Sequence, residues 1–180
     1  MIVVDVETTG VDPKENSLLS IGAVDFENPD NYFYGECKLR ERAVINPKAL
    51  DVNGFTIEKI NSSEKTCKEL LEAFLLWANK IQDKTLAGHN VQFDYNFIFE
   101  HFKFYNLTCP FSYRVVDLHS IFYYHLLKQG IEIPLKNNSS ILGLDKIMEY
   151  LKIEKREGYH NALEDAQITA KIFSILLNQK

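Results

Sequence analysis

The sequence predicts an α/β fold in which a mixed central sheet of about five strands carries helices on both faces. Three strand-like runs come first, and helical segments then alternate with short apolar runs. Neighbouring runs joined by a tight turn pair antiparallel, whereas strands separated by a helix can return in the same direction. Hydrophobic residues make up 46% of the 180 residues and charged residues 25%, as in an ordinary folded protein. We therefore expect a single domain over residues 1–180.

The first three strands are expected at Ile2–Val6, Leu18–Phe26 and Tyr32–Leu39. The stretch NPDN (Asn28–Asn31) separates the second run from the third, and its residues are typical of turns. This arrangement predicts a hairpin, and it makes the first part of the sheet antiparallel.

Two helices follow the hairpin. A short helical turn opens at Asn46-Pro47 and ends at Gly54, because proline suits the first helical position and glycine the position after the last one. Thr66 and Glu69 then form a capping-box pattern that starts a longer helix. The apolar residues of this helix share one broad face at helical spacing: Leu70, Leu71, Phe74, Leu75, Trp77, Ala78 and Ile81.

The second half of the chain alternates short strands with helices. Strands are expected at Thr85–Asn90 and at Arg114–Val116, and Leu135–Ser140 is expected to be a loop. The helices are expected at Phe93–Phe104, from Asp117 to about Lys128, at Leu142–Leu151 and at Asn161–Leu177.

Net charge, cysteine content and the lengths of the apolar runs limit the class of protein and the compartment that we expect. A net charge of −5 argues against a protein that coats nucleic acid electrostatically, but it allows an enzyme whose acidic site is neutralised by metal. Cys37, Cys67 and Cys109 are scattered, which fits a reducing compartment better than a disulfide framework. No basic stretch precedes the first apolar run, and no run approaches the roughly 20 residues of a membrane span. We expect a cytoplasmic protein with no membrane partner.

The first strand ends in an unusual pair of carboxylates. Asp5 and Glu7, in IVVDVETTG, are two residues apart, so both point to one face of a strand. Burying an unpaired carboxylate costs several kcal/mol, and two together call for a cation. A turn-capping Asp beside an ordinary surface Glu is the alternative.

Three further residues suit the same site. Asp94, in GHNVQFD, follows a buried-looking strand and enters a helix, where an isolated Asp is usually a cap. In HNALEDA, Asn161 and Glu164 have the spacing of a helix cap, which leaves His160 just outside the helix and fixes Asp165 within its first turn. A histidine at such a place is otherwise an ordinary surface residue.

Together these side chains predict metal-assisted phosphodiester hydrolysis. Carboxylate oxygens are the ligands that suit Mg²⁺ or Mn²⁺ rather than zinc. Two such ions about 4 Å apart stabilise the attacking and leaving oxygens of an in-line displacement at phosphorus. A neutral histidine near pH 7 can take the proton of the attacking water.

The motifs DVETTG, HNVQFD and HNALEDA, in this order, resemble those of the DnaQ-like 3′–5′ exonucleases of the DEDDh subgroup, and the resemblance spans nearly the whole chain. It implies a ribonuclease-H-like fold and two Mg²⁺ ions, for which Mn²⁺ would substitute. It also implies release of nucleoside 5′-monophosphates from single-stranded 3′ ends. The related subgroup with a catalytic tyrosine needs it four residues before the last Asp, where this chain has Asn161, and Tyr159 lies two residues too early.

The resemblance assigns a role to each of the five residues. Asp5 would bridge both ions, and Glu7 and Asp165 would hold the ion that binds the attacking water. Asp94 would act on the second ion, and His160 would be the general base.

The resemblance also suggests contacts to the terminal nucleotide. Thr8, Thr9 and Gly10 could offer backbone amides to it, in addition to forming a tight turn. Phe55 could stack on a base, which contributes about 1–3 kcal/mol in other proteins, but core packing is the preferred interpretation.

His89 and Asn90 match the family's HN pair and are included among the substrate contacts, although support of the site is the preferred role. Asp117 sits where the family tends to carry Asp, and we expect helix capping or indirect support rather than metal binding. A basic loop before the last helix could meet the phosphate backbone or simply be solvated: Lys152, Lys155 and Arg156.

Alternatives remain at the level of the whole function. A catalytically silent module that binds nucleic acid or a polymerase would show a degraded site position, and none of the five is degraded. An internal-cutting nuclease of the same fold class is a second alternative. The sequence leaves open DNA or RNA as substrate, and a DNA polymerase or a homodimer as partner. The residues after the last helix, 178–180, are too few for a polymerase-binding tail, which favours a free-standing enzyme or an isolated domain.

Overall fold

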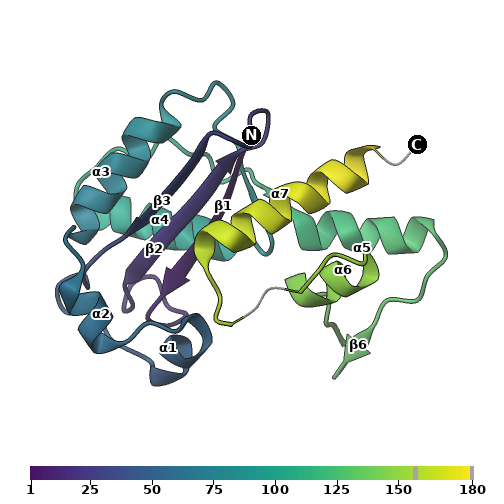
Figure 1. Ribbon diagram of the computed structural model, residues 1–180, viewed down its shortest axis with the longest axis horizontal. Coiled ribbons are helices and arrows are strands. Elements are labelled where there is room, and N and C mark those ends of the chain that lie inside the picture. Colours follow the sequence, from purple (N-terminus) through teal and green to yellow (C-terminus); the bar gives the residue numbers. More distant parts are fainter. Residues whose placement is uncertain (156–157, 179–180) are drawn as a thin grey trace.

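A five-stranded mixed sheet forms the centre of the protein in the computed structural model, which describes residues 1–155 and 158–178 (Figure 1). The strand order is β3-β2-β1-β4-β5. The strands are β1 (Ile2–Thr8), β2 (Leu18–Asp25), β3 (Tyr32–Glu36), β4 (Leu86–Gly88) and β5 (Val116–Asp117). The first three pair antiparallel, and β4 and β5 continue the sheet parallel to β1. The mixed sheet expected from the sequence is confirmed.

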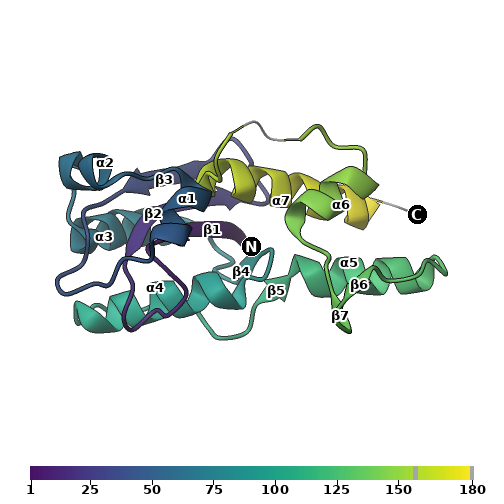
Figure 2. The same ribbon diagram turned by 90° about the horizontal axis from the view of Figure 1, so that it is seen from below.

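Helices cover both faces of the sheet. The helix α7 (Ala162–Asn178) crosses one face, while α3 (Cys67–Ala78) and α4 (Gln92–Phe104) cover the other (Figure 2). The helices α5 (Leu118–Lys128) and α6 (Leu144–Tyr150) pack with α7 in one hydrophobic cluster beyond the β4–β5 edge. Two short helices, α1 (Pro47–Asn53) and α2 (Ile57–Ser62), lie at the edge where β1 ends.

The alternation of side chains between the two faces of the sheet along β1 determines where its acidic residues point. The core under α3 and α4 contains Ile2, Val4 and Val6 of this strand, whereas the core under α7 contains Val3. Successive strand residues point to opposite faces, so Asp5 and Glu7 share the face of Val3. The carboxylates therefore point to the side of the sheet that α7 covers.

The capping box that was expected to start α3 is present. The Thr66 side chain accepts a hydrogen bond from the Glu69 amide, and the Glu69 side chain accepts one from the Thr66 amide. The predicted apolar face is the buried one: Leu70, Leu71, Phe74, Ala78 and Ile81 are buried, and Leu75 and Trp77 are partly buried against the same core.

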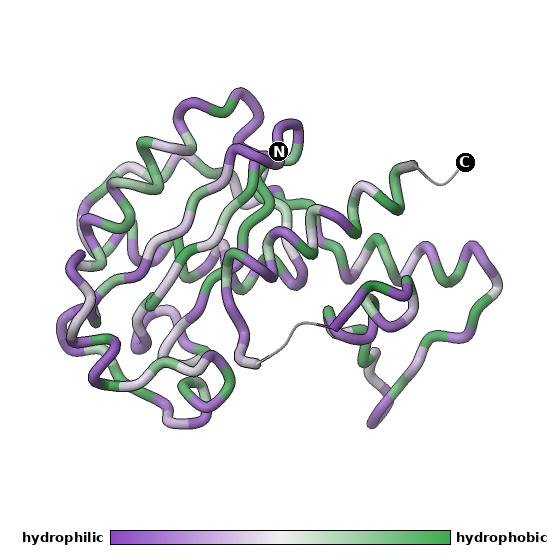
Figure 3. The backbone as a smooth tube through the Cα atoms, in the orientation of Figure 1, coloured by the Kyte–Doolittle hydropathy of each residue, from purple (hydrophilic) through white to green (hydrophobic). Residues whose placement is uncertain are grey.

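Two features differ from the expectations. The segment Leu135–Ser140, predicted to be a loop, forms a small hairpin of β6 (Leu135–Lys136) and β7 (Ser139–Ser140), so that prediction was wrong. Asn137 and Asn138, both with positive φ, make its turn, because asparagine tolerates this conformation. The tip of the hairpin is hydrophilic (Figure 3). The helix α2 was not predicted at all.

Smaller shifts affect several boundaries. β1 runs two residues further than expected, β3 stops at Glu36 instead of Leu39, and α6 starts at Leu144 instead of Leu142. Among the helices described, none is both long enough and apolar enough to cross a membrane.

Candidate active site

The end of β1 lies against the first turn of α7. In the pairing of β1 with β2, Asp5 is opposite Gly22 and Glu7 is opposite Ser20. A Cβ atom on Gly22 would lie 2.2 Å from the backbone carbon of Ala162 and from the backbone nitrogen of Leu163. The absence of a side chain at Gly22 thus lets α7 press directly on the sheet next to Asp5.

This close approach brings together residues that are about 155 positions apart in the sequence. One ligand atom each from Glu7, His160 and Asp165 lie within 4.8 Å of one another. The distance between His160 Nδ1 and Asp165 Oδ2 is 3.4 Å, and the two side chains are 42% and 4% exposed. The group therefore combines two buried carboxylates with an imidazole that water can reach.

Asp94, on α4, contacts the same end of β1. Its Oδ1 accepts a hydrogen bond of 2.9 Å from the backbone amide of Val6, the residue between the two β1 carboxylates. The N-cap residue of α4 is Val91, so Asp94 does not cap this helix. Burial raises the pKa of the Asp94 carboxyl well above its ordinary value, and the nearby carboxylates of Glu7 and Asp117 add to the rise, while the Val6 amide opposes it.

The residues before α7 hold His160 outside the helix, as the capping pattern predicts. The Asn161 side chain accepts hydrogen bonds of 3.1 Å from the amides of Leu163 and Glu164. The His160 amide donates to the Val52 carbonyl of α1 at 3.2 Å. Asp165 lies in the first turn of α7. The histidine is therefore anchored through its backbone to α1, while its side chain points to the acidic group.

These residues fit a hard divalent cation. Carboxylates from β1, α4 and α7 meet at one strand end, and three of them, Glu7, Asp94 and Asp165, are buried. Buried like charges raise one another's pKa and cost stability unless a cation compensates them. The Ser20 hydroxyl, buried opposite Glu7, has no hydrogen-bond partner among the described residues.

The turn after β1 is tied into the fold by its own hydrogen bonds. The Thr9 amide donates to the Ser17 carbonyl at 2.9 Å, and the Thr9 hydroxyl donates to the Val44 carbonyl at 2.8 Å. The Thr8 hydroxyl donates to the Gly10 carbonyl at 2.6 Å. The Thr9 amide that was expected to meet the substrate is therefore used within the turn.

Sequence reasoning missed one residue that supports this turn. The buried side chain of Asn53, at the end of α1, donates a hydrogen bond of 3.0 Å to the Thr8 carbonyl, and its oxygen accepts from the Phe55 amide at 3.2 Å. No motif marked Asn53, although it lies in the VNGFT stretch that contains Phe55.

The remaining candidates lie around the site with different exposures. Phe55 is buried with Leu19 and Ile60, in agreement with the preferred expectation of core packing. Asn90 is exposed, and the rings of His89 and His119 lie 6.3 Å apart beside it in a pocket at the end of β4.

Asp117 caps α5, as expected, and its second oxygen also accepts from the Val91 amide at the start of α4. Of the basic loop, Lys152 and Lys155 are exposed, whereas Arg156 lies outside the described residues.

The fold and the acidic site define an α/β protein of the exonuclease class. The RNase_T family model, described as "Exonuclease", matches residues 2–173. The chain belongs to this family, and the expectation of a DnaQ-like exonuclease with a ribonuclease-H-like fold is confirmed.

The chain is 30% identical over 181 residues to the "3'-5' DNA exonuclease Cap18" of Escherichia coli, covering 97% of this chain and 90% of that protein. It is 26% identical over 172 residues to the "DNA polymerase III PolC-type" of Thermotoga maritima, covering 96% of this chain and 11% of the polymerase. Among solved structures, E. coli exonuclease I in complex with a dT13 oligonucleotide shares the fold with a TM-score of 0.77 at 17% identity. That match covers 98% of this chain and 40% of the exonuclease I chain.

Proposed function

We propose that the protein is a 3′–5′ exonuclease that depends on divalent metal and removes nucleoside 5′-monophosphates from single-stranded DNA ends. The observation that carries the proposal is the convergence of Glu7, His160 and Asp165 at the end of β1. The relative that this chain covers over most of its length is named as a 3′–5′ DNA exonuclease, which favours DNA over RNA and the 3′–5′ direction.

Each acidic residue has a proposed role. Asp5, Glu7, Asp94 and Asp165 would hold two Mg²⁺ ions, for which Mn²⁺ would substitute. When bound, two such ions stabilise the attacking and leaving oxygens of an in-line displacement at phosphorus. Because Asp94 is buried among other carboxylates, cation binding would favour its ionised form.

His160 would act as the general base. Its Nδ1 lies 3.4 Å from Asp165, which orients the ring, and its side chain is exposed enough to reach a water molecule at the site. A neutral imidazole would take the proton of the attacking water, and the nearby carboxylate would stabilise the imidazolium that forms.

The substrate and partner assignments complete the proposal. The turn of Thr8 and Gly10, together with His89 and Asn90, would contact the terminal nucleotide. We also propose a single domain over residues 1–180, a cytoplasmic location, and a DNA polymerase or a second copy of the chain as candidate partners.

One assay tests the proposal. A single DNA strand and the RNA strand of the same sequence, both labelled at the 5′ end, are incubated with Mg²⁺ or with EDTA. We expect a ladder of products that shorten from the 3′ end of the DNA, no reaction in EDTA, and slower shortening of the RNA. The variant His160→Ala should be slower by about 10²- to 10⁴-fold, the usual contribution of a positioned acid or base.

Cuts in the middle of the strand would contradict the exonuclease assignment. Equal activity of His160→Ala and the wild type would remove His160 from the role of base. A protein that binds the strand but leaves it intact in Mg²⁺ and in Mn²⁺ would instead be a silent binding module.

A further inference from the structure

The first turn of α7 rests on a row of residues that runs across the sheet. In the strand register Asp5 of β1 is opposite Gly22 of β2, and Gly22 is opposite Tyr34 of β3. Cross-strand neighbours share one face of a sheet, so the side chains of Asp5 and Tyr34 point toward α7 on either side of the bare backbone of Gly22. The backbone of Ala162 and Leu163 sits above Gly22, between Asp5 and Tyr34.

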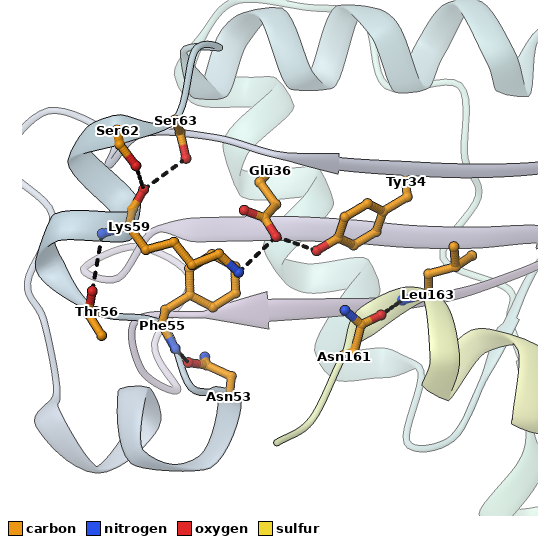
Figure 4. Close-up of polar contacts among 10 residues, drawn as sticks. All are labelled: Tyr34, Glu36, Asn53, Phe55, Thr56, Lys59, Ser62, Ser63, Asn161 and Leu163. Carbon is orange, nitrogen blue, oxygen red and sulfur yellow. Dashed lines mark hydrogen bonds and ion pairs between the residues drawn. The ribbon is translucent and has the colours of Figure 1, made fainter. Parts of the chain in front are cut away.

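A chain of polar contacts holds Tyr34 in this row. Its hydroxyl donates a hydrogen bond of 2.5 Å to Glu36 Oε1, and the same oxygen lies 2.9 Å from Lys59 Nζ on α2 (Figure 4). Burial and the neighbouring Glu36 raise the pKa of Tyr34, so the hydroxyl remains a donor at any ordinary pH.

The same hydroxyl faces the cap of α7. Figure 4 shows the side chains of Tyr34 and Asn161 facing each other across the gap between β3 and α7. Asn161 is close enough to oppose part of the rise in the pKa of Tyr34. Since the Asn161 oxygen accepts from the amides of Leu163 and Glu164, its amide NH₂ is the group that can donate to Tyr34. The bonded group of Lys59, Glu36 and Tyr34 thus joins α2 to the edge strand, and its Tyr34 end faces Asn161 at the beginning of α7.

We propose that Gly22, Tyr34 and Asn161 form a seat for the first turn of α7 that positions His160 and Asp165 against Asp5 and Glu7. Gly22 sets the depth to which the helix approaches the sheet, and Tyr34 sets its lateral position through Asn161. His160 directly precedes Asn161 and Asp165 follows it by four residues, so a displaced Asn161 moves both. The three residues are positioning residues, and the inference rests on the function proposed above.

The test compares Tyr34→Phe, which removes only the hydroxyl, with Tyr32→Phe, a control on the same strand whose tyrosine is exposed. Both variants and the wild type are assayed for kcat and KM on the single DNA strand. Affinity for Mn²⁺ is measured by electron paramagnetic resonance, which needs no substrate. Tyr34→Phe should lower kcat by about tenfold, change KM by less than about twofold, and weaken Mn²⁺ binding, because small misplacements of catalytic groups are costly. Tyr32→Phe should behave as the wild type.

Gly22→Ala gives a second measurement, because its new methyl group would push the backbone of α7 away from the sheet. If it folds, its loss of kcat should exceed that of Tyr34→Phe. If it does not fold, Tyr34→Phe alone decides. A folded Tyr34→Phe with wild-type kcat and wild-type Mn²⁺ affinity would contradict the proposal that this seat positions α7.

The two proposals can fail separately. A wild-type protein that binds Mn²⁺ but leaves DNA ends intact would contradict the proposed function. The Mn²⁺ affinities of the variants would still show whether the seat positions the metal-binding residues.

Discussion

At the scale of single residues, His101 is a buried group outside the acidic site. Its Nε2 accepts a hydrogen bond of 3.1 Å from the Leu18 amide, so its Nδ1 carries the proton and donates to the Phe97 carbonyl at 2.8 Å. Burial lowers the pKa of His101 from 6.5 to about 4. The neutral ring is thus the form that joins α4 to β2.

This depressed pKa predicts a loss of stability in acid. Between about pH 6.5 and pH 4 the unfolded chain binds a proton at His101 that the folded chain does not, so stability is complete above about pH 6.5 and falls as the pH drops. At pH 5 the loss would be about 2 kcal/mol relative to pH 7. Urea unfolding at both pH values measures it, with His101→Gln as the reference in which this contribution is missing. Equal losses in the wild type and in His101→Gln would contradict the prediction.

The candidate catalytic residues illustrate what single positions reveal. The strand alternation of Asp5 and Glu7 predicts that they share a face, and the Asn161 cap pattern predicts where His160 and Asp165 lie relative to α7. No local pattern predicts the bond between Asp94 and the Val6 amide, because it joins residues 88 positions apart and depends on how α4 docks. The position of Asp94 after a buried strand and at a helix start made it a candidate, and the resemblance to known motifs strengthened that expectation.

At the scale of elements, Asp117 connects three pieces of the fold. It ends β5, caps α5 by accepting from the Ser120 amide at 2.9 Å, and accepts from the Val91 amide at 3.0 Å before α4. One carboxylate therefore satisfies amides of two helices near the acidic site.

Its removal should cost more than the loss of an ordinary cap. Asp117→Ala should lower the free energy of unfolding by about 2–3 kcal/mol, because two backbone amides lose their acceptor. Thr66→Ala, which removes the one bond that the Thr66 side chain accepts from a backbone amide of α3, is the matched control and should cost about 1 kcal/mol. Chemical unfolding of both variants measures the difference, and equal losses would show that the Asp117–Val91 bond contributes nothing.

The elements that the sequence did not predict are the shortest ones. The six residues of α2 offer too few apolar positions for a helical pattern, although its N-cap, Thr56, accepts from the Lys59 amide. The strands β6 and β7 have two residues each, so alternation cannot be recognised. The longer helices and the first three strands were predictable because their patterns extend over several turns or pairs.

At the scale of the whole molecule, the order of the sheet places the site. The sequence predicts antiparallel early strands and a mixed sheet, but not that β4 pairs with β1 rather than with β3. This pairing puts the start of α4 beside the end of β1, and Gly22 lets α7 close the site from the other side. Both features arise from long-range packing that no segment encodes alone.

The central claim is that acidic side chains from β1, α4 and α7 converge to hold divalent metal ions. Anomalous diffraction from a crystal soaked in Mn²⁺ tests it most directly. We expect manganese density at the end of β1, about 2.1 Å from carboxylate oxygens of Glu7 and Asp165. Manganese density elsewhere only, or carboxylates that turn away from one another with no metal between them, would contradict the claim.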